Sequence, residues 1–247
     1  MRSAFVLVAL CLATPARADS DDIVGRPLVL DRGQLAAELT AEINAAPGQI
    51  ALPISFAPDV SWGATSRLTI GVFHSRSSVD RFAPGASFCV RAQCRAFYNG
   101  SGIDVRWAAS PGIVPRLRLL ARELDPWKPA VLAGALLGWR RGRFAIVADP
   151  YLQLGLANTD RGNRSALFLP ISLTVQPTCR WALTLRTGWN SDLAVWTDGW
   201  HIPIFAGVRA RATEHFDVAA GLGFSSLLGP QNTAKERVVF LAIGWRS

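Results

Sequence analysis

The chain has 247 residues, of which 50% are hydrophobic, and its mean hydropathy of +0.22 is high for a soluble secreted protein. Its formal net charge of +8 could suit a nucleic-acid partner, but the cations are mostly single arginines on alternating segments, without a nucleic-acid motif. These properties argue against nucleic-acid binding. They leave two explanations of the apolar composition, a well-filled soluble core or a barrel that faces lipid.

The N-terminus carries the three parts of a secretory signal peptide. Arg2 provides the positive charge, residues 4–13 are apolar but too few to span a bilayer as a helix, and Ala16-Arg17-Ala18 is a cleavage site. Cys11 would suit a lipoprotein signal, but Leu10 stands before it where a small residue is required. We therefore expect export and cleavage after Ala18.

The expected organisation has three parts. Residues 1–18 are the signal peptide, residues 19–33 are a short, polar periplasmic leader, and residues 34–247 are the barrel. No segment after the signal approaches the roughly 18 apolar residues that a membrane helix needs.

After the leader, apolar and polar residues alternate with period two, which indicates strands rather than helices. In residues 166–176, for example, Leu169, Ile171 and Leu173 lie opposite Ser172 and Thr174. The mean segment length is close to the roughly nine to eleven residues of a tilted membrane strand, whereas soluble strands average about five or six. About twelve strands are expected, at 34–43, 49–64, 67–74, 102–109, 116–124, 130–140, 143–158, 166–176, 181–190, 201–213, 216–225 and 237–245.

The first of these segments is also compatible with a helix. Its alanines and glutamates favour helix. However, apolar residues occupy every second position, which favours a strand; they are Leu35, Ala37, Leu39, Ala41 and Ile43.

The connections between the segments alternate in length. Short turns are expected at 65–66, 110–115, 141–142, 177–180 and 214–215, and mostly longer loops at 75–101, 125–129, 159–165, 191–200 and 226–236. Outer-membrane barrels have short periplasmic turns and longer extracellular loops. The fold class predicted is therefore an all-β, antiparallel, up-and-down transmembrane β-barrel that follows a signal peptide.

Aromatic residues gather near both ends of the expected strands. Tryptophan rings prefer the membrane–water interfaces, because the ring body is apolar while its N–H needs a polar partner. Strand ends of any β protein can carry tryptophan, but the strand lengths favour two membrane belts. The belt residues expected are Trp62, Trp107, Trp139, Trp181 and Trp245 at the short-turn end, and Trp127, Trp189, Trp196 and Trp200 at the long-loop end.

Two of the cysteines lie close together in the longest expected loop. An exported protein meets an oxidising compartment, so we expect a disulfide between Cys89 and Cys94. Cys179 is then an odd thiol. No metal site and no cofactor are expected, since histidines are absent near these cysteines.

The alternation also predicts which charged side chains face the lumen. Rings of arginine select anions, although interior charges of a small barrel commonly neutralise one another. Arg116, Arg118 and Arg122 share one expected strand, so we expect them to be the least neutralised. The inward arginines expected are Arg106, Arg116, Arg118, Arg122, Arg186, Arg209 and Arg211, against Glu38, Glu42, Asp59, Asp104, Asp149 and Asp217.

Enzymatic activity is not expected. A Ser–His pair for acyl transfer must lie on one face of a strand, but His74 and Ser75 are adjacent, His201 precedes Ile202-Pro203, and His215 lies in a tight turn. No nucleophile elbow, zinc motif or phosphate-binding loop is present in the sequence.

Two segments resemble a known group of proteins. Residues 25–33, GRPLVLDRG, are similar to the leader of uncharacterised outer-membrane β-barrel (porin-like) proteins of deltaproteobacteria, and residues 57–72, APDVSWGATSRLTIGV, are similar to a strand–turn–strand unit of the same proteins. The resemblance implies an outer-membrane location and no chemistry. One departure is the C-terminus, Gly244-Trp245-Arg246-Ser247, which lacks the terminal aromatic residue typical of such barrels.

Three hypotheses about function follow. The first is a channel or small-solute porin in the outer membrane of a Gram-negative bacterium, with an arginine-rich lumen that favours small anionic solutes. The second is a closed barrel with a structural or surface-binding role through loop 75–101. The third is an outer-membrane enzyme or a soluble β protein. The partners expected are outer-membrane lipid and the barrel-assembly machinery.

Overall fold

The computed structural model describes residues 23–48, 50–52, 54–74, 88–90, 94, 97–98, 100–230 and 232–247, without the side chains of 233–236. The expected signal peptide, the first residues of the leader and most of loop 75–101 lie outside the described residues. Among the residues that are described, no helix is long and apolar enough to cross a membrane.

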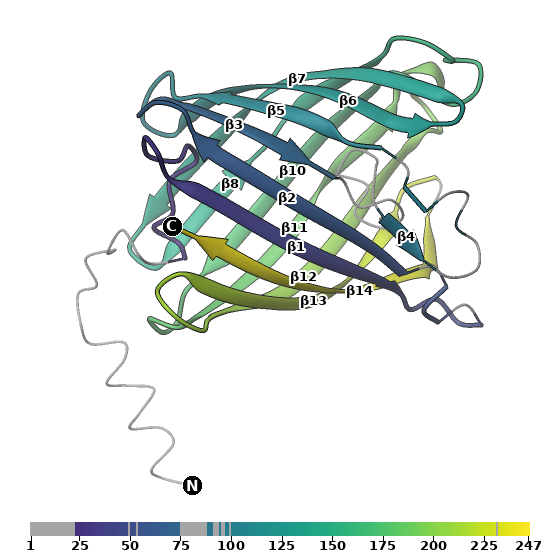
Figure 1. Cartoon of the computed structure of the whole chain (residues 1–247). Coiled ribbons are helices and arrows are strands. Elements are labelled where there is room, and N and C mark those ends of the chain that lie inside the picture. The colour runs from purple at the N-terminus through teal and green to yellow at the C-terminus, as the bar shows by residue number, and fades with distance from the viewer. Residues whose placement is uncertain are drawn as a thin grey trace, which may run out of the picture.

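The strands form one antiparallel sheet that closes into a barrel, because β1 pairs with both β2 and β14 (Figure 1). Their bounds are β1 Leu35–Asn44, β2 Ile54–Gly63, β3 Leu68–Phe73, β4 Phe88–Val90, β5 Gly102–Trp107, β6 Ile113–Leu124, β7 Trp127–Arg141, β8 Phe144–Ala148, β9 Tyr151–Gly155, β10 Ala166–Val175, β11 Trp181–Asp192, β12 Trp200–Arg211, β13 Phe216–Leu228 and β14 Thr233–Arg246. A single short helix, η1 (Leu193–Val195), lies between β11 and β12 in the described part of the chain.

Two of the short strands do not add to the wall of the barrel as separate members. β8 and β9 both pair with β7 and with β10, and the register is unchanged across Asp149-Pro150, so they form one wall strand. Pro150 has no N–H to donate to the ladder, which explains the interruption. β4 pairs only with β2 and lies at the loop end. The barrel therefore has twelve wall strands, which confirms the fold predicted from the alternation.

The outer surface of the barrel is apolar along the whole wall. Outward side chains such as Leu119, Leu183 and Ile243 are 51%, 53% and 54% exposed. A continuous apolar surface of this extent would aggregate in water, and lipid is the solvent that accepts it. The closed ring also pairs every strand edge, which a bilayer requires.

The connections follow the expected alternation, with corrections in length. The leader and the C-terminus lie at the end with short turns (Figure 1). The prediction of a loop at 125–129 is wrong in its bounds, because β6 ends at Leu124 and β7 already begins at Trp127. The expected long loop 226–236 is also too long, because β13 extends to Leu228 and β14 begins at Thr233. The strands extend through these residues, but register shifts before Leu124 and before Ser226 interrupt the period-two alternation, so the pattern alone misplaced the strand ends.

Candidate functional site: the barrel interior

One cluster of charged residues, which we call the Asp104 network, lies on the inner face of β5, β6 and the β8–β9 wall strand. Asp104 receives ion pairs from Arg106 at 2.7 Å and from Arg116 at 2.6 Å. Asp149 also forms ion pairs, and its carboxylate lies 2.8 Å from the guanidinium of Arg116 and 2.7 Å from that of Arg118. Asp104 and Arg118 are both buried.

The register explains how these residues meet. Asp104 lies directly opposite Arg118, and Arg106 opposite Arg116, in the β5–β6 ladder. Asp149 belongs to the wall strand beyond β7. On β7 between them, Gly134 lies directly opposite Arg116 and adds no side chain to the inner face. A Cβ at Gly134 would lie 2.6 Å from the Cβ of Tyr151, so only glycine fits there.

The sequence-based expectation that Arg116 and Arg118 would be the least neutralised is therefore wrong. Residues 130–140 offer no acid, as expected from the sequence, but the next wall strand supplies Asp149 over the glycine. Arg122, on the same strand, has a different partner. Its guanidinium lies 3.4 Å from Oδ1 of Asn163.

Apolar and aromatic side chains fill the interior next to this network. The Arg118 guanidinium lies 4.8 Å from the centre of the Tyr151 ring, which stacks on Phe168 at 4.7 Å. Leu120 and Leu132 are buried against Tyr151. This side of the lumen, from β6 to β10, is thus packed like a protein core rather than lined by water.

The opposite side of the lumen, along β11, β12 and β13, has a different lining. The inward residues Thr184, Gly207, Ala219 and Gly221 are small and half-buried. Phe240 of β14 occupies the room that two of these glycines leave, and it packs against the buried side chains of Phe205 and Val238. A Cβ on Gly207 would lie 2.9 Å from Cζ of Phe240, and one on Gly221 would lie 2.5 Å from it.

A second charge cluster lies at the short-turn end of this side. Arg209 of β12 pairs with Glu38 of β1 at 2.5 Å and with Asp217 of β13. Arg26 of the leader also pairs with Asp217, at 2.6 Å. Asp217 is buried, and these two arginines neutralise its charge there.

The other two expected lumen arginines lie on the same side of the lumen as Arg209. The inward face of β11 carries Arg186, and that of β12 carries Arg211 beyond Arg209. Both are half-buried and engaged with other residues.

The leader is the part of the interior that the sequence did not reveal. A polar segment was expected, but within its described residues 23–33 Val24, Val29 and Leu30 are buried among inward residues of the wall. The available signal was the apolar run Leu28-Val29-Leu30 in an otherwise polar segment.

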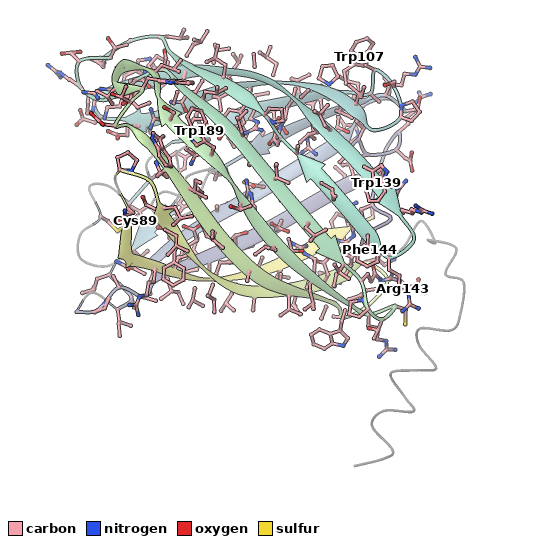
Figure 2. The ribbon with its side chains drawn as sticks, turned by 180° about the vertical axis from the view of Figure 1, so that it is seen from behind. Cys89, Trp107, Trp139, Arg143, Phe144 and Trp189 are labelled. Carbon is pink, nitrogen blue, oxygen red and sulfur yellow. A yellow bond between two sulfur atoms is a disulfide. The ribbon has the colours of Figure 1, made fainter. Side chains whose placement is uncertain are left out.

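Tryptophans mark both ends of the barrel. Figure 2 shows Trp107 and Trp139 at the end with short turns, together with Phe144, and Trp189 at the other end. The side chains of Trp62 and Trp181 at the short-turn end, and of Trp127 and Trp196 at the loop end, are exposed. Trp200 and Trp245 are half-buried, and Trp189 meets Trp196 edge-on at 4.9 Å.

The cysteine prediction is confirmed at the loop end, where Cys89 and Cys94 form a disulfide, and Cys179 is free and exposed. Each of the three histidines has its own separate hydrogen-bond partner. His74 contacts the carbonyl of Pro58, His201 contacts Asn190, and His215 contacts the carbonyl of Arg246. Among the described residues, no group of three or more His, Cys, Asp or Glu could hold a metal ion.

Comparisons with known proteins support the fold. No protein-family model matches the sequence, and no curated protein matches it. The NanC porin is 8% identical over 85% of this chain and 98% of its own, with a TM-score of 0.58. An outer-membrane channel from Pseudomonas putida F1 is 10% identical over 89% of this chain and 97% of its own, with a TM-score of 0.51. The chain therefore has the fold of outer-membrane β-barrels of the porin type.

Proposed function

We propose that the protein is an outer-membrane channel for small solutes that favours anions. The observation that carries this proposal is the unequal lining of the lumen. Packed side chains fill the side from β6 to β10. The inner faces of β11, β12 and β13 instead carry small, half-buried residues such as Thr184 and Gly221, next to a smaller cluster of Phe205, Val238 and Phe240. The path for solutes then runs along β11 to β13, beside the packed side.

The charge of this path supports anion preference. Arg186, Arg209 and Arg211 line it, and Arg209 is paired with Glu38 and Asp217. Three arginines against these two carboxylates leave a net positive charge along the path. A residual positive potential attracts anions in a narrow lumen, as arginine rings do in anion pores. The arginines of the Asp104 network contribute less, since their carboxylates neutralise them.

The topology suggests how the chain sits in the cell. With short turns in the periplasm, as in other outer-membrane barrels, the start of β1 and the end of β14 lie on the periplasmic side. We propose cleavage after Ala18, a leader of residues 19–33, a barrel of residues 34–247, and insertion by the barrel-assembly machinery. The likeness of residues 25–33 and 57–72 to deltaproteobacterial barrels is consistent with this.

The alternative is a closed barrel that acts through its external surface. The packed half of the lumen favours it, as does a cluster of aromatic rings at the loop end beside the disulfide. There Phe88 meets Tyr98 at 4.7 Å and Phe97 at 5.6 Å. An enzymatic role is not proposed.

Single-channel recording of the refolded protein in planar bilayers separates these functions. In a salt gradient, we expect a reversal potential that reports anion preference. Arg186→Gln removes one charge from the open wall but keeps its hydrogen-bonding capacity. One charge at about 5 Å in water changes the energy of a chloride ion by about 0.8 kcal/mol, so the permeability ratio should fall by up to roughly fourfold.

Arg141→Gln is the matched control, because Arg141 lies exposed at a turn and is expected to leave selectivity unchanged. Conductance with the same selectivity in the wild type and in Arg186→Gln would refute the role of the arginines. No conductance in any variant would favour the closed barrel.

A further inference from the structure

The leader spans the short-turn mouth of the barrel. The carbonyl of Gly25 accepts a hydrogen bond from Arg140 of β7, while the next residue, Arg26, pairs with Asp217 of β13. In the ring, β8–β9, β10, β11 and β12 separate β7 from β13, so these anchors lie on nearly opposite sides of the lumen. The leader is therefore a bar across the mouth rather than a tail beside it.

Further contacts hold the leader along its length. The Val24 amide donates to Gln176 Oε1 at 3.0 Å, beyond the end of β10, and the Leu30 amide donates to Thr69 Oγ1 of β3 at 2.8 Å. Val29 packs against Val114 of β6 and Leu136 of β7. The wall thus binds the leader through polar side chains and through an apolar surface, which we call the apolar seat, around Val29.

The wall is also shaped to admit the leader. A Cβ on Gly63 would clash with the carbonyl of Asp31, and a Cβ on Gly138 would lie 2.8 Å from Cδ1 of Leu28. Inward glycines at these two positions create the room in which the leader lies. A passing segment without a role in the mouth would not require this complementarity.

Two cavities of the mouth border the leader, one towards β14 and one towards β7. One, of about 280 Å³, lies towards β1 and β14 and is lined by Arg26, Glu38, Arg209 and Arg246. The other, of about 640 Å³, lies towards β5 to β8 and is lined by Ser110, Gly112, Gly138 and Arg140. Residues Arg26, Pro27 and Leu28 of the leader line both cavities and so lie between them.

We propose that the leader is a built-in bar that sets the upper size of the solutes that pass the periplasmic mouth. This inference rests on the proposed channel function. The bar is held by the Arg26–Asp217 ion pair on one side and by the Val29 contacts on the other. Asp217 remains paired with Arg209 when Arg26 leaves, so releasing the leader does not leave a buried carboxylate unpaired.

Release and locking of the leader test the inference in the full-length mature protein. Arg26→Ala with Val29→Asp removes the ion pair and introduces a charge into the apolar seat. Arg32→Ala is the matched control, since Arg32 is an exposed cation of the same segment. Swelling of liposomes in neutral sugars of increasing size measures the size limit without an effect of solute charge.

The lock is a pair of cysteines, Leu28→Cys with Gly138→Cys, in a Cys179→Ser background. The Cβ of a residue at 138 would lie 3.5 Å from Cγ of Leu28, which is close to where the sulfur of a cysteine at 28 would lie. When this cysteine pair is added to the release variant, its oxidation to a disulfide should hold the leader against the wall again. Single-cysteine variants under the same reductant report any effect of reducing Cys89–Cys94.

We expect the release variant to admit sugars that the wild type and Arg32→Ala exclude, and the oxidised lock to abolish this gain reversibly. Passage of all solutes only after release would also support the bar. Equal size limits in the wild type and the release variant, with both conducting ions, would overturn it. No passage in any variant, with the release variant folded, would instead refute the channel function itself.

Discussion

Replacement of Asp104 by asparagine tests whether the Asp104 network holds the filled side of the barrel together. Asp104 is 2% exposed and accepts from Arg106 at 2.7 Å and from Arg116 at 2.6 and 3.0 Å. Arg118 lies 3.6 Å from the same carboxylate. Asparagine keeps the shape of the side chain but removes the charge that faces these three cations.

The expected loss of stability is large because the arginines cannot all find another acid. Asp149 already pairs with Arg116 and Arg118, so Arg106 loses its carboxylate partner and Arg116 retains one. Removal of one member of a buried ion pair costs about 3–5 kcal/mol. We expect Asp104→Asn to lower the free energy of unfolding by that amount, measured by tryptophan fluorescence during urea unfolding in lipid vesicles.

Two further variants make the result specific. Asp160→Asn makes the same chemical change at an exposed loop position and should alter stability by less than about 0.5 kcal/mol. Arg116→Gln added to Asp104→Asn should recover part of the loss, because it removes an uncompensated charge. A loss below about 1 kcal/mol for Asp104→Asn, the range of exposed pairs, would mean that water reaches the network and that this side of the lumen is not packed.

Three other predictions follow from the wall and the loops. Gly221→Ala should lower single-channel conductance, because the new Cβ would lie 2.5 Å from Cζ of Phe240 and would push this ring into the solute path. Adding Phe240→Ala should restore the conductance, and an unchanged conductance in Gly221→Ala would place the path elsewhere. Cys89→Ser with Cys94→Ser should leave heat-modifiable migration intact but speed protease cleavage of the loop, since closing so short a loop stabilises by only about 2 kcal/mol or less; loss of the folded band would show that the disulfide supports the barrel. The mature protein should fractionate with outer membranes and resist carbonate extraction, and recovery in the soluble periplasmic fraction would contradict a lipid-facing wall.

Period-two alternation determined the fold because it is a local property of each strand. Leu117 and Leu119 must face lipid if Arg116 and Arg118 face inward, whatever the rest of the chain does. Short, regular connections then leave an up-and-down barrel as the arrangement that pairs every edge. The disulfide was also predictable, since Cys89 and Cys94 are close in sequence and exported.

The partners of the inward residues were decided only by the tertiary structure. Arg116 meets Asp149 across β7, where the register places Gly134 opposite Arg116 and so leaves no side chain in the way, and no pattern within either strand encodes that register. The leader crosses the mouth because Arg26 and Asp217, far apart in sequence, meet after the barrel closes. Alternation assigns a side chain to the inside of the barrel, but contact across a lumen depends on strand order, tilt and register together, and these exist only in the closed structure.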